Sequence, residues 1–170
     1  MLCVIARIDP GARERLAALR RKAEARTERT GELYGHITLA TYVGDEEERF
    51  IASCRGLISG RRAFAVRYAR IEPLPATGIL VASPEKNGVL LALHEEIAAA
   101  WRGSLDRWTG DADWKPHTTL IHNPCGDLQV IAAALEEAFV PFTARVERIE
   151  FSRVEEDGYT IVDGIDLPKE

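Results

Sequence analysis

The chain has 170 residues, of which 46% are hydrophobic, and its net charge is −5. This length allows one good-sized core or two small lobes that share an interface, and the acidic balance argues against broad, non-specific binding to duplex DNA. No apolar run approaches the roughly 20 residues of a membrane span, and the first residues lack the charged start and cleavage site of a signal peptide. The three cysteines, Cys3, Cys54 and Cys125, have no metal-like spacing. We therefore expect a cytoplasmic protein with reduced, buried thiols that contacts no membrane.

The first part of the chain predicts strands and helices in alternation. Apolar Leu16, Leu19 and Ala23 recur at helical spacing in a segment rich in arginine. A second helix starts with acidic residues near its positive end and stops at Gly60. The predicted elements are a strand at 2–8, a helix at 11–28, a strand at 36–43, a helix at 44–60 and a strand at 63–74.

The second part of the chain predicts the same alternation and then one extra strand. The predicted elements are a strand at 77–84, a helix at 88–103, a strand at 116–122, a helix at 127–139, and strands at 142–154 and 159–167. The last two strands flank the turn-like sequence EEDG and indicate a hairpin.

The order strand-helix-strand-helix-strand thus occurs twice, and the residues support a duplication. FAVRYARIE begins at Phe64 and FTARVERIE at Phe142, with five identical residues in register. HITL begins at His36, and HTTL begins at His117. The sequence therefore predicts one domain built from two pseudo-symmetric halves, about 1–75 and 76–155, plus a C-terminal strand.

Strand alternation decides which side chains accompany each histidine. His36, Thr38 and Tyr42 should share one face, opposite an apolar face with Ile37 and Leu39. His117 and Thr119 repeat this arrangement in the second half. His122, five residues after His117, should point away and be structural.

Two histidines facing each other across a cleft suit the cleavage of a phosphodiester. One imidazole can be neutral and take a proton while the other is charged and gives one. Two threonine hydroxyls can bind the negative charge on the non-bridging oxygens. The sequence shows no acidic cluster with a metal-like arrangement and no glycine-rich phosphate loop, so it predicts neither metal nor other cofactor.

These motifs resemble the two H-x-T-x motifs of the 2H phosphoesterase superfamily, and within it the 2′-5′ RNA ligase-like, or cyclic phosphodiesterase, group. The resemblance covers essentially the whole chain. It extends to VIARIDP before the first helix, to the W-x-P-H-x-T-L pattern that starts at Trp114, and to Ser152 and Tyr159 in the last hairpin.

The resemblance implies an α+β, bilobal fold in which two antiparallel sheets line a central cleft with helices on the outside. It implies metal-independent hydrolysis of RNA or nucleotide 2′,3′-cyclic phosphates or 2′-5′ linkages, with possible reversal as a 2′-5′ RNA ligase. We also expect a monomer. Carried over by motif, His36 and His117 are the acid and base, and Thr38 and Thr119 bind phosphate.

Several residues and two other classes of function stay open. Lys115 at the cleft mouth can contact a phosphate or be a solvated loop lysine, and Tyr42 can stack on a base. Arg67 and Arg145 either face the cleft or form structural salt bridges. The first rival function is a non-catalytic nucleotide- or RNA-binding module. The second is a metal site on His36 and His117, which lacks a convincing third ligand.

Overall fold

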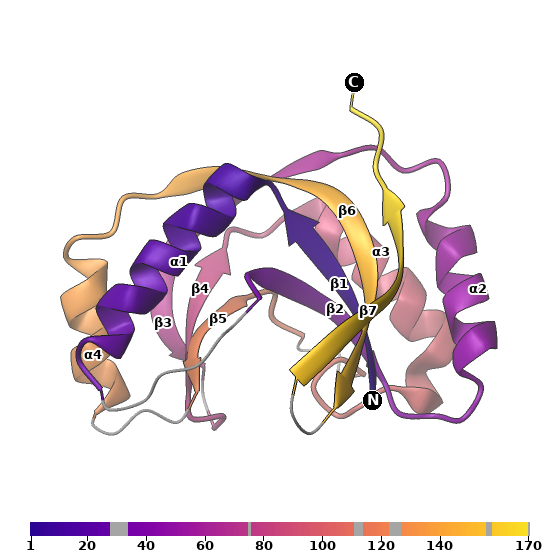
Figure 1. Cartoon of the computed structure of the whole chain (residues 1–170), viewed down its shortest axis with the longest axis horizontal. Helices are drawn as coiled ribbons and strands as arrows, with labels where there is room; N and C mark the ends of the chain where they lie inside the picture. Colours follow the sequence, from indigo (N-terminus) through magenta and orange to yellow (C-terminus); the bar gives the residue numbers. More distant parts are fainter. Residues whose placement is uncertain (28–33, 75, 111–113, 123–126, 156–157, 170) are drawn as a thin grey trace.

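The computed structural model describes residues 1–27, 34–74, 76–110, 114–122, 127–155 and 158–169. Within them the chain forms four α-helices, a short 3₁₀ helix and seven strands (Figure 1). In chain order these are β1 (Leu2–Ile8), α1 (Pro10–Glu24), β2 (His36–Tyr42), α2 (Glu47–Ile58), β3 (Phe64–Leu74), β4 (Ile79–Pro84), α3 (Gly88–Trp101), η1 (Arg102–Ser104), β5 (Thr118–His122), α4 (Leu128–Glu136), β6 (Phe142–Glu155) and β7 (Gly158–Asp166). No helix in these ranges is long and apolar enough to cross a membrane.

Each predicted helix and strand is confirmed, with ends that differ by a few residues. The largest shifts are in α1, which ends at Glu24, in α2, which begins at Glu47, and in α4, which ends at Glu136. The predicted hairpin is also confirmed, because β6 and β7 pair in antiparallel fashion from Glu155 and Gly158 onward. One difference concerns the site: β5 begins at Thr118, so His117 lies immediately before the strand.

The start of α1 is fixed by Asp9, which joins the helix to the sheet. One carboxylate oxygen accepts the N–H of Ala12 at 2.9 Å and caps the helix, and Pro10 supplies a first residue that needs no hydrogen bond. The other carboxylate oxygen accepts the N–H of Arg145 at 2.7 Å. The chain therefore leaves β1 and enters α1 at a defined angle over β6.

The strands form one antiparallel sheet, so the prediction of two separate sheets is wrong. Among the described residues the order is β2-β1-β6-β3-β4-β5, with β7 also paired to β6. The reason is the length of β6, which has 14 residues. Its first residues pair with β3, and the rest pair with β1 and β7. One strand thus joins what would otherwise be two sheets.

The strand order is symmetric about its middle. If β1 is exchanged with β4, β2 with β5 and β3 with β6, the order read from the other end is the same. The helices follow the same rule, because α1 packs with α4 and α2 packs with α3. Figure 1 shows the two helix pairs at opposite ends of an arched sheet. Each end of the molecule therefore combines elements from both halves of the sequence, and the α+β class with helices on the outside is confirmed.

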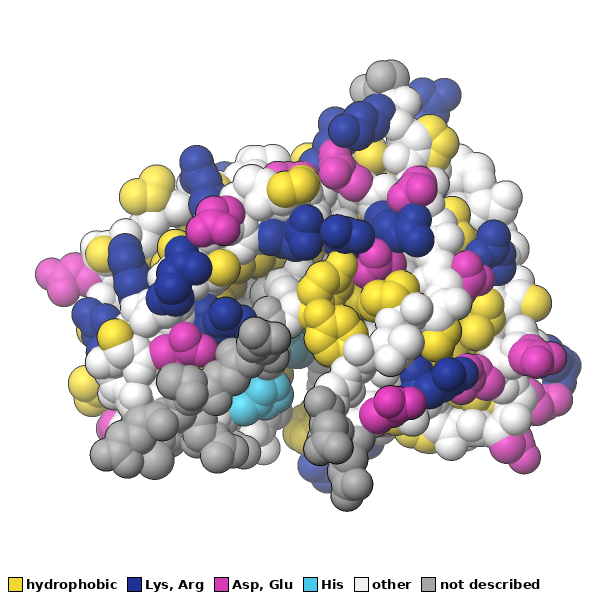
Figure 2. Space-filling model, viewed as in Figure 1, with side chains coloured by type: hydrophobic (Ala, Val, Ile, Leu, Met, Phe, Trp, Pro, Cys, Tyr) yellow, Lys and Arg dark blue, Asp and Glu magenta, His cyan; other side chains and the backbone are white. Residues whose placement is uncertain are grey.

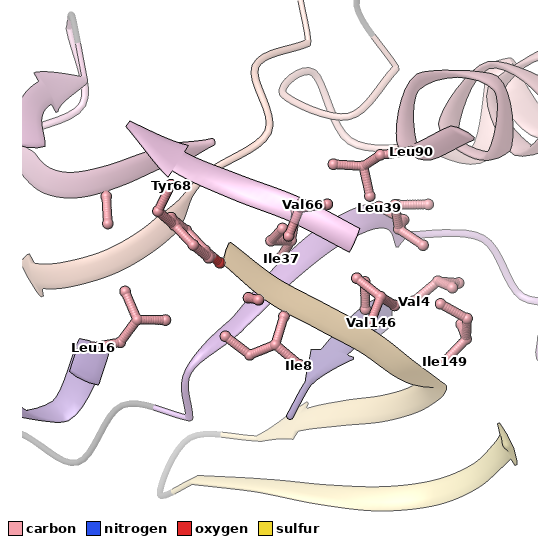
Figure 3. Packing of buried hydrophobic residues seen from close by; sticks show 14 of the residues in the cluster. Val4, Ile8, Leu16, Ile37, Leu39, Val66, Tyr68, Leu90, Val146 and Ile149 are labelled. Atoms are coloured by element: carbon pink, nitrogen blue, oxygen red, sulfur yellow. The ribbon is translucent and has the colours of Figure 1, made fainter. Parts of the chain in front are cut away.

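The core lies between the sheet and the helices. Figure 3 shows Val4 and Ile8 from β1, Ile37 and Leu39 from β2, and Val146 from β6 converging in it. These five side chains are at most 1% exposed. Burying one such aliphatic side chain stabilises the fold by about 1.5–3 kcal/mol. The motif strand β2 is therefore anchored through its apolar residues.

Candidate active site

The strand that carries His36 contains a β-bulge. Val4 of β1 lies opposite Ala40 and Ile5 lies opposite Thr38, which leaves Leu39 as an extra residue. A bulge of this kind reverses which side chains share a face on its two sides. Thr38 and Thr41, three residues apart, consequently line the same cleft.

The bulge makes the predicted position of Tyr42 wrong. This side chain is only 3% exposed, and its ring stacks on Phe50 of α2 with centroids 4.4 Å apart. The hydroxyl accepts the N–H of Glu46 at 2.8 Å. Tyr42 is thus part of the packing between sheet and helices and does not line the cleft.

The same irregularity occurs in the strand that follows His117. Val81 of β4 lies opposite Thr119 and Leu80 lies opposite Ile121, so Leu120 is the extra residue. The prediction that His122 points away is therefore wrong, because the bulge at Leu120 returns it to the face of Thr119. His122 and Thr119 line one cleft.

Between the two motif strands lies a cleft of about 580 Å³. Figure 2 shows a hollow in the middle of one face with histidine side chains inside it. Thr38 of the first motif and His117 and Thr119 of the second line this cleft, and so does Lys115. The remaining lining residues are Thr41, Leu74, Ala76, Thr77, Ile79, Asp106, Arg107, Trp108, Thr109, Trp114 and His122.

Both motif histidines are held by the same kind of contact. His36 Nδ1 bonds the carbonyl oxygen of Tyr34, and His117 Nδ1 bonds the carbonyl oxygen of Lys115 at 2.7 Å. A carbonyl only accepts, so each Nδ1 carries the proton. In the neutral form each imidazole therefore has an unprotonated Nε2 that can take a proton.

The electrostatic surroundings of the two histidines are coupled. Burial lowers the pKa of His36, and a positive charge on His117 lowers it further, whereas the carbonyl of Tyr34 and the carboxylate of Glu150 act in the opposite sense. Burial also lowers the pKa of His117, and His122 adds to this effect. His36 and His117 thus lie close enough to influence each other, and both favour the neutral state more than a solvated histidine does.

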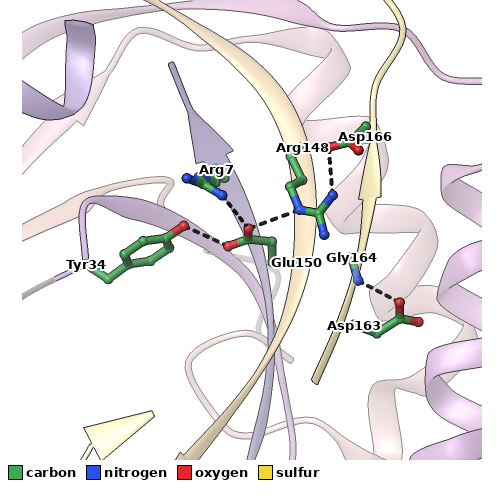
Figure 4. A network of polar contacts seen from close by, with 7 residues as sticks. All are labelled: Arg7, Tyr34, Arg148, Glu150, Asp163, Gly164 and Asp166. Carbon is green, nitrogen blue, oxygen red and sulfur yellow. Dashed lines mark hydrogen bonds and ion pairs between the residues drawn. The ribbon is translucent and has the colours of Figure 1, made fainter. Parts of the chain in front are cut away.

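A buried carboxylate supports the His36 side of the site. Glu150 is 2% exposed and accepts hydrogen bonds from Arg7 at 2.9 Å, Arg148 at 3.1 Å and the hydroxyl of Tyr34 at 2.8 Å (Figure 4). Burial and Glu150 together raise the pKa of Tyr34 to about 12. Because the carbonyl of Tyr34 holds His36, this network positions the imidazole through one intervening residue.

The two motif strands are tied together by a buried hydroxyl chain. Thr118 is 1% exposed, and its hydroxyl donates to the backbone oxygen of His36 at 2.9 Å. Because that proton is used, the hydroxyl of Tyr68 donates in turn to Thr118 Oγ1 at 2.6 Å. Thr118, in the second motif, therefore holds the backbone of His36 in the first motif.

Thr118→Val should destabilise the protein by about 1–3 kcal/mol, because it leaves the buried Tyr68 hydroxyl and a backbone oxygen without their hydrogen bonds. Tyr68→Phe should cost less, since Thr118 can still donate to His36. In urea unfolding, the double variant should lose less stability than the two single losses added together. Strict additivity would show that the chain does not act as a unit.

Other predicted candidates lie away from the cleft lining. Arg67 forms an exposed ion pair with Glu85 at 2.5 Å, which favours the structural alternative. Arg145 binds the carboxylate of Asp9 through its backbone N–H. Neither arginine is among the residues that line the cleft. Among the described residues, no group of three His, Cys, Asp or Glu side chains has the arrangement of a metal site.

The thiols behave largely as the sequence predicts. Cys3 and Cys54 are buried, and burial raises the pKa of the Cys54 thiol to about 12. Cys125 lies outside the described residues.

Sequence reasoning missed the loop before the second motif. Asp106, Arg107 and Trp108 line the cleft together with Trp114. Two tryptophans and a basic residue within eight positions, shortly before His117, were the available indication. His122 and Thr41 were missed for a different reason, because strict alternation placed them on the wrong face.

The chain is similar to known proteins in sequence pattern and in fold. The model of the 2′-5′ RNA ligase superfamily matches residues 8–158. A comparison with curated protein sequences finds no match.

Solved structures share the fold over nearly the whole chain. A Thermus thermophilus protein, TT0787, is 22% identical and gives a TM-score of 0.68, with 99% of this chain and 98% of that chain covered. Escherichia coli LigT in complex with 3′-AMP is 17% identical with a TM-score of 0.69, covering 98% and 97%. LigT in complex with NADP+ is 15% identical with a TM-score of 0.62, covering 99% and 98%. The family match spans most of the chain, and we conclude that the protein belongs to the 2′-5′ RNA ligase superfamily.

Proposed function

We propose that this protein is a metal-independent phosphodiesterase that hydrolyses 2′,3′-cyclic phosphates or 2′-5′ linkages of RNA or nucleotides by two-histidine acid–base catalysis. One observation carries the proposal: His117, Thr119 and Thr38 line one cleft, His36 lies close enough to His117 to feel its charge, and each imidazole has its Nδ1 held by a backbone carbonyl. LigT, which shares the fold, has been crystallised with 3′-AMP and NADP+, and this supports a nucleotide as the guest.

The reaction divides between the two Nε2 atoms. For a cyclic phosphate, one neutral imidazole takes a proton from water as the water oxygen bonds to phosphorus. The bond from phosphorus to one ribose oxygen breaks, and the other, charged imidazole donates its proton to that oxygen. The product is a 2′- or 3′-phosphomonoester. Either histidine can fill either role, and attack by a ribose hydroxyl in the reverse direction would join RNA ends.

The threonines and Lys115 complete the proposed site. Thr38 and Thr119 would donate to the non-bridging oxygens, whose charge increases in the transition state. The side chain of Lys115 is exposed and lines the cleft, so it can contact the phosphate, while its carbonyl orients His117.

The two halves also support a proposal about origin. We infer an internal duplication, because the bulges at Leu39 and Leu120 follow equivalent threonines and the strand order is the same from either end. The chain would then be one domain of two related halves, about 1–75 and 76–155, with β7 added.

The test is hydrolysis of a nucleoside 2′,3′-cyclic phosphate and of a 2′-5′-linked dinucleotide with excess chelator present. We expect turnover of at least one of them, with release of a phosphomonoester from the cyclic compound. Tight binding of the product nucleotide without turnover of either compound would instead favour the non-catalytic binding module. Activity only after addition of a divalent metal would contradict the proposed mechanism.

The pH dependence provides a second test. The active free enzyme carries one proton on the histidine pair, and both pKa values lie below the ordinary histidine value. That state is therefore most populated at mildly acidic pH and is lost as pH rises through its pKa. We expect kcat/KM to peak below about pH 6.5 and to fall about tenfold per pH unit above neutrality. An optimum clearly above pH 7 would contradict this assignment.

A further inference from the structure

One tryptophan at the cleft is left largely uncovered. Trp101 and Trp114 pack against the hydrophobic core, whereas Trp108 is 48% exposed. It lines the same cleft as Thr38, His117 and Thr119. A half-exposed indole inside a concave polar site has apolar surface available to a ligand rather than to the core.

The loop that carries Trp108 is held rigidly against the first motif strand. The N–H of Asp106 donates to the carbonyl of Thr41 at 2.9 Å, and the N–H of Thr41 donates to Thr109 Oγ1 at 2.8 Å. The carboxylate of Asp106 accepts both the N–H and the hydroxyl of Thr109, at 2.8 and 2.7 Å. Trp108 therefore stands at the tip of a turn that is already ordered, so a ligand would not bear the cost of ordering it.

The end of this turn requires a glycine. The N–H of Gly110 donates to the carbonyl of Asp106 at 2.8 Å, and a Cβ at this position would lie 2.9 Å from that same carbonyl oxygen. The turn is thus closed tightly directly after Trp108 and Thr109.

Two basic side chains, Arg107 and Lys115, line the cleft together with Trp108. The guanidinium of Arg107 lies 4.3 Å from the centre of the Trp108 ring, so a cation covers one part of the indole. The carboxylate of Asp106 lines the cleft too, but this group already accepts a hydrogen bond from the hydroxyl of Thr109. The protein is acidic overall, but this end of the cleft suits an anionic ligand.

The cleft also has an apolar part. Leu74 and Ile79, at the two ends of the turn between β3 and β4, line the cleft together with Trp108. Ile79 lies opposite His122 in the sheet, so this apolar part is continuous with the polar part of the cleft. One part of the cleft thus offers hydroxyls and imidazoles, and the other offers flat aromatic and aliphatic surface.

We propose that Trp108, backed by Arg107, is the stacking platform for the nucleobase attached to the reacting phosphate. The substrate is then a nucleoside or oligonucleotide and not a base-free cyclic phosphodiester. This inference rests on the proposed function and adds the residue that binds the nucleobase. Stacking tolerates every base because each has a π-face, so Trp108 confers a requirement for a base with a preference for the larger purines.

The kinetic test compares Trp108→Ala with Trp108→Phe on adenosine 2′,3′-cyclic phosphate, uridine 2′,3′-cyclic phosphate and base-free ribose 2,3-cyclic phosphate. Trp108→Ala should lower kcat/KM on the adenosine compound by roughly 5- to 150-fold, mainly through KM. It should leave the base-free compound unchanged and remove the purine preference. Trp108→Phe should restore most of the loss. Equal losses on all three compounds, or no loss, would overturn the proposal.

A binding measurement keeps this inference separate from the proposed reaction. Calorimetry with 3′-AMP and with inorganic phosphate requires no turnover. Trp108→Ala should weaken 3′-AMP binding by a similar factor and leave phosphate binding as it is. If the wild-type protein hydrolyses no cyclic compound, the proposed reaction fails, and the 3′-AMP result alone decides whether Trp108 is a platform. Undiminished 3′-AMP binding by Trp108→Ala would reject it.

Discussion

Replacing either His36 or His117 with alanine should lower kcat/KM on a nucleoside 2′,3′-cyclic phosphate by about 10²- to 10⁴-fold. Each change removes one of the two Nε2 atoms between which the proposed reaction divides its proton transfers. The two groups act on one transition state, so the double variant should be hardly worse than the more damaged single variant. Single-turnover and steady-state rates with the same cyclic substrate measure both effects.

His122→Asn is the matched comparison for these variants. It removes an imidazole from the same cleft but outside the two H-x-T motifs, so it should cost much less than either alanine variant. All variants should keep the wild-type far-UV circular dichroism. If His122→Asn abolished turnover and His117→Ala did not, the proton donor and acceptor would have been assigned to the wrong residues.

The two threonines should show the second-largest effect. Thr38→Val and Thr119→Val each remove a hydroxyl from the cleft lining while keeping the size and branching of the side chain. Removing a donor that stabilises transition-state charge costs up to about 10²–10³-fold. We expect each valine variant to lose kcat with a smaller change in KM, and to lose less than the histidine variants.

Thr143→Val makes the same substitution on an exposed residue of β6 outside the cleft lining, and it should keep wild-type kinetics. A matching loss in Thr143→Val would mean that the effect reflects strand stability rather than phosphate binding. An unchanged kcat in both Thr38→Val and Thr119→Val would remove the hydroxyls from the proposed mechanism.

The order and type of the elements were predictable because apolar spacing, caps and turns are local. The two H-x-T pairs were found for the same reason, since each lies within one short segment. The single sheet could not be predicted in this way. It depends on how far β6 runs past β3 before β1 takes over, and pairing between distant strands leaves no local pattern.

The wrong placements of Tyr42 and His122 share one physical cause. Alternation holds only while two strands stay in register, and one extra residue reverses it. Leu39 and Leu120 are apolar residues in apolar strands, so nothing in their type marks them as bulges. The backbone of Leu39 is instead satisfied from another element, because the Nδ1–H of His94 on α3 donates to its carbonyl at 2.8 Å.

The pairing order of the sheet has a mechanical consequence for the cleft. Thr38 and Thr119 sit on β2 and β5, the two end strands of one continuous hydrogen-bonded path. Thr118 donates across the gap to the backbone of His36, so the two ends are also pinned to each other. Changing the width of the cleft would require bending the whole sheet or breaking the hydrogen bond between Thr118 and His36. The sheet and this hydrogen bond therefore fix the distance between the two motifs, so the cleft should bind guests of one size class.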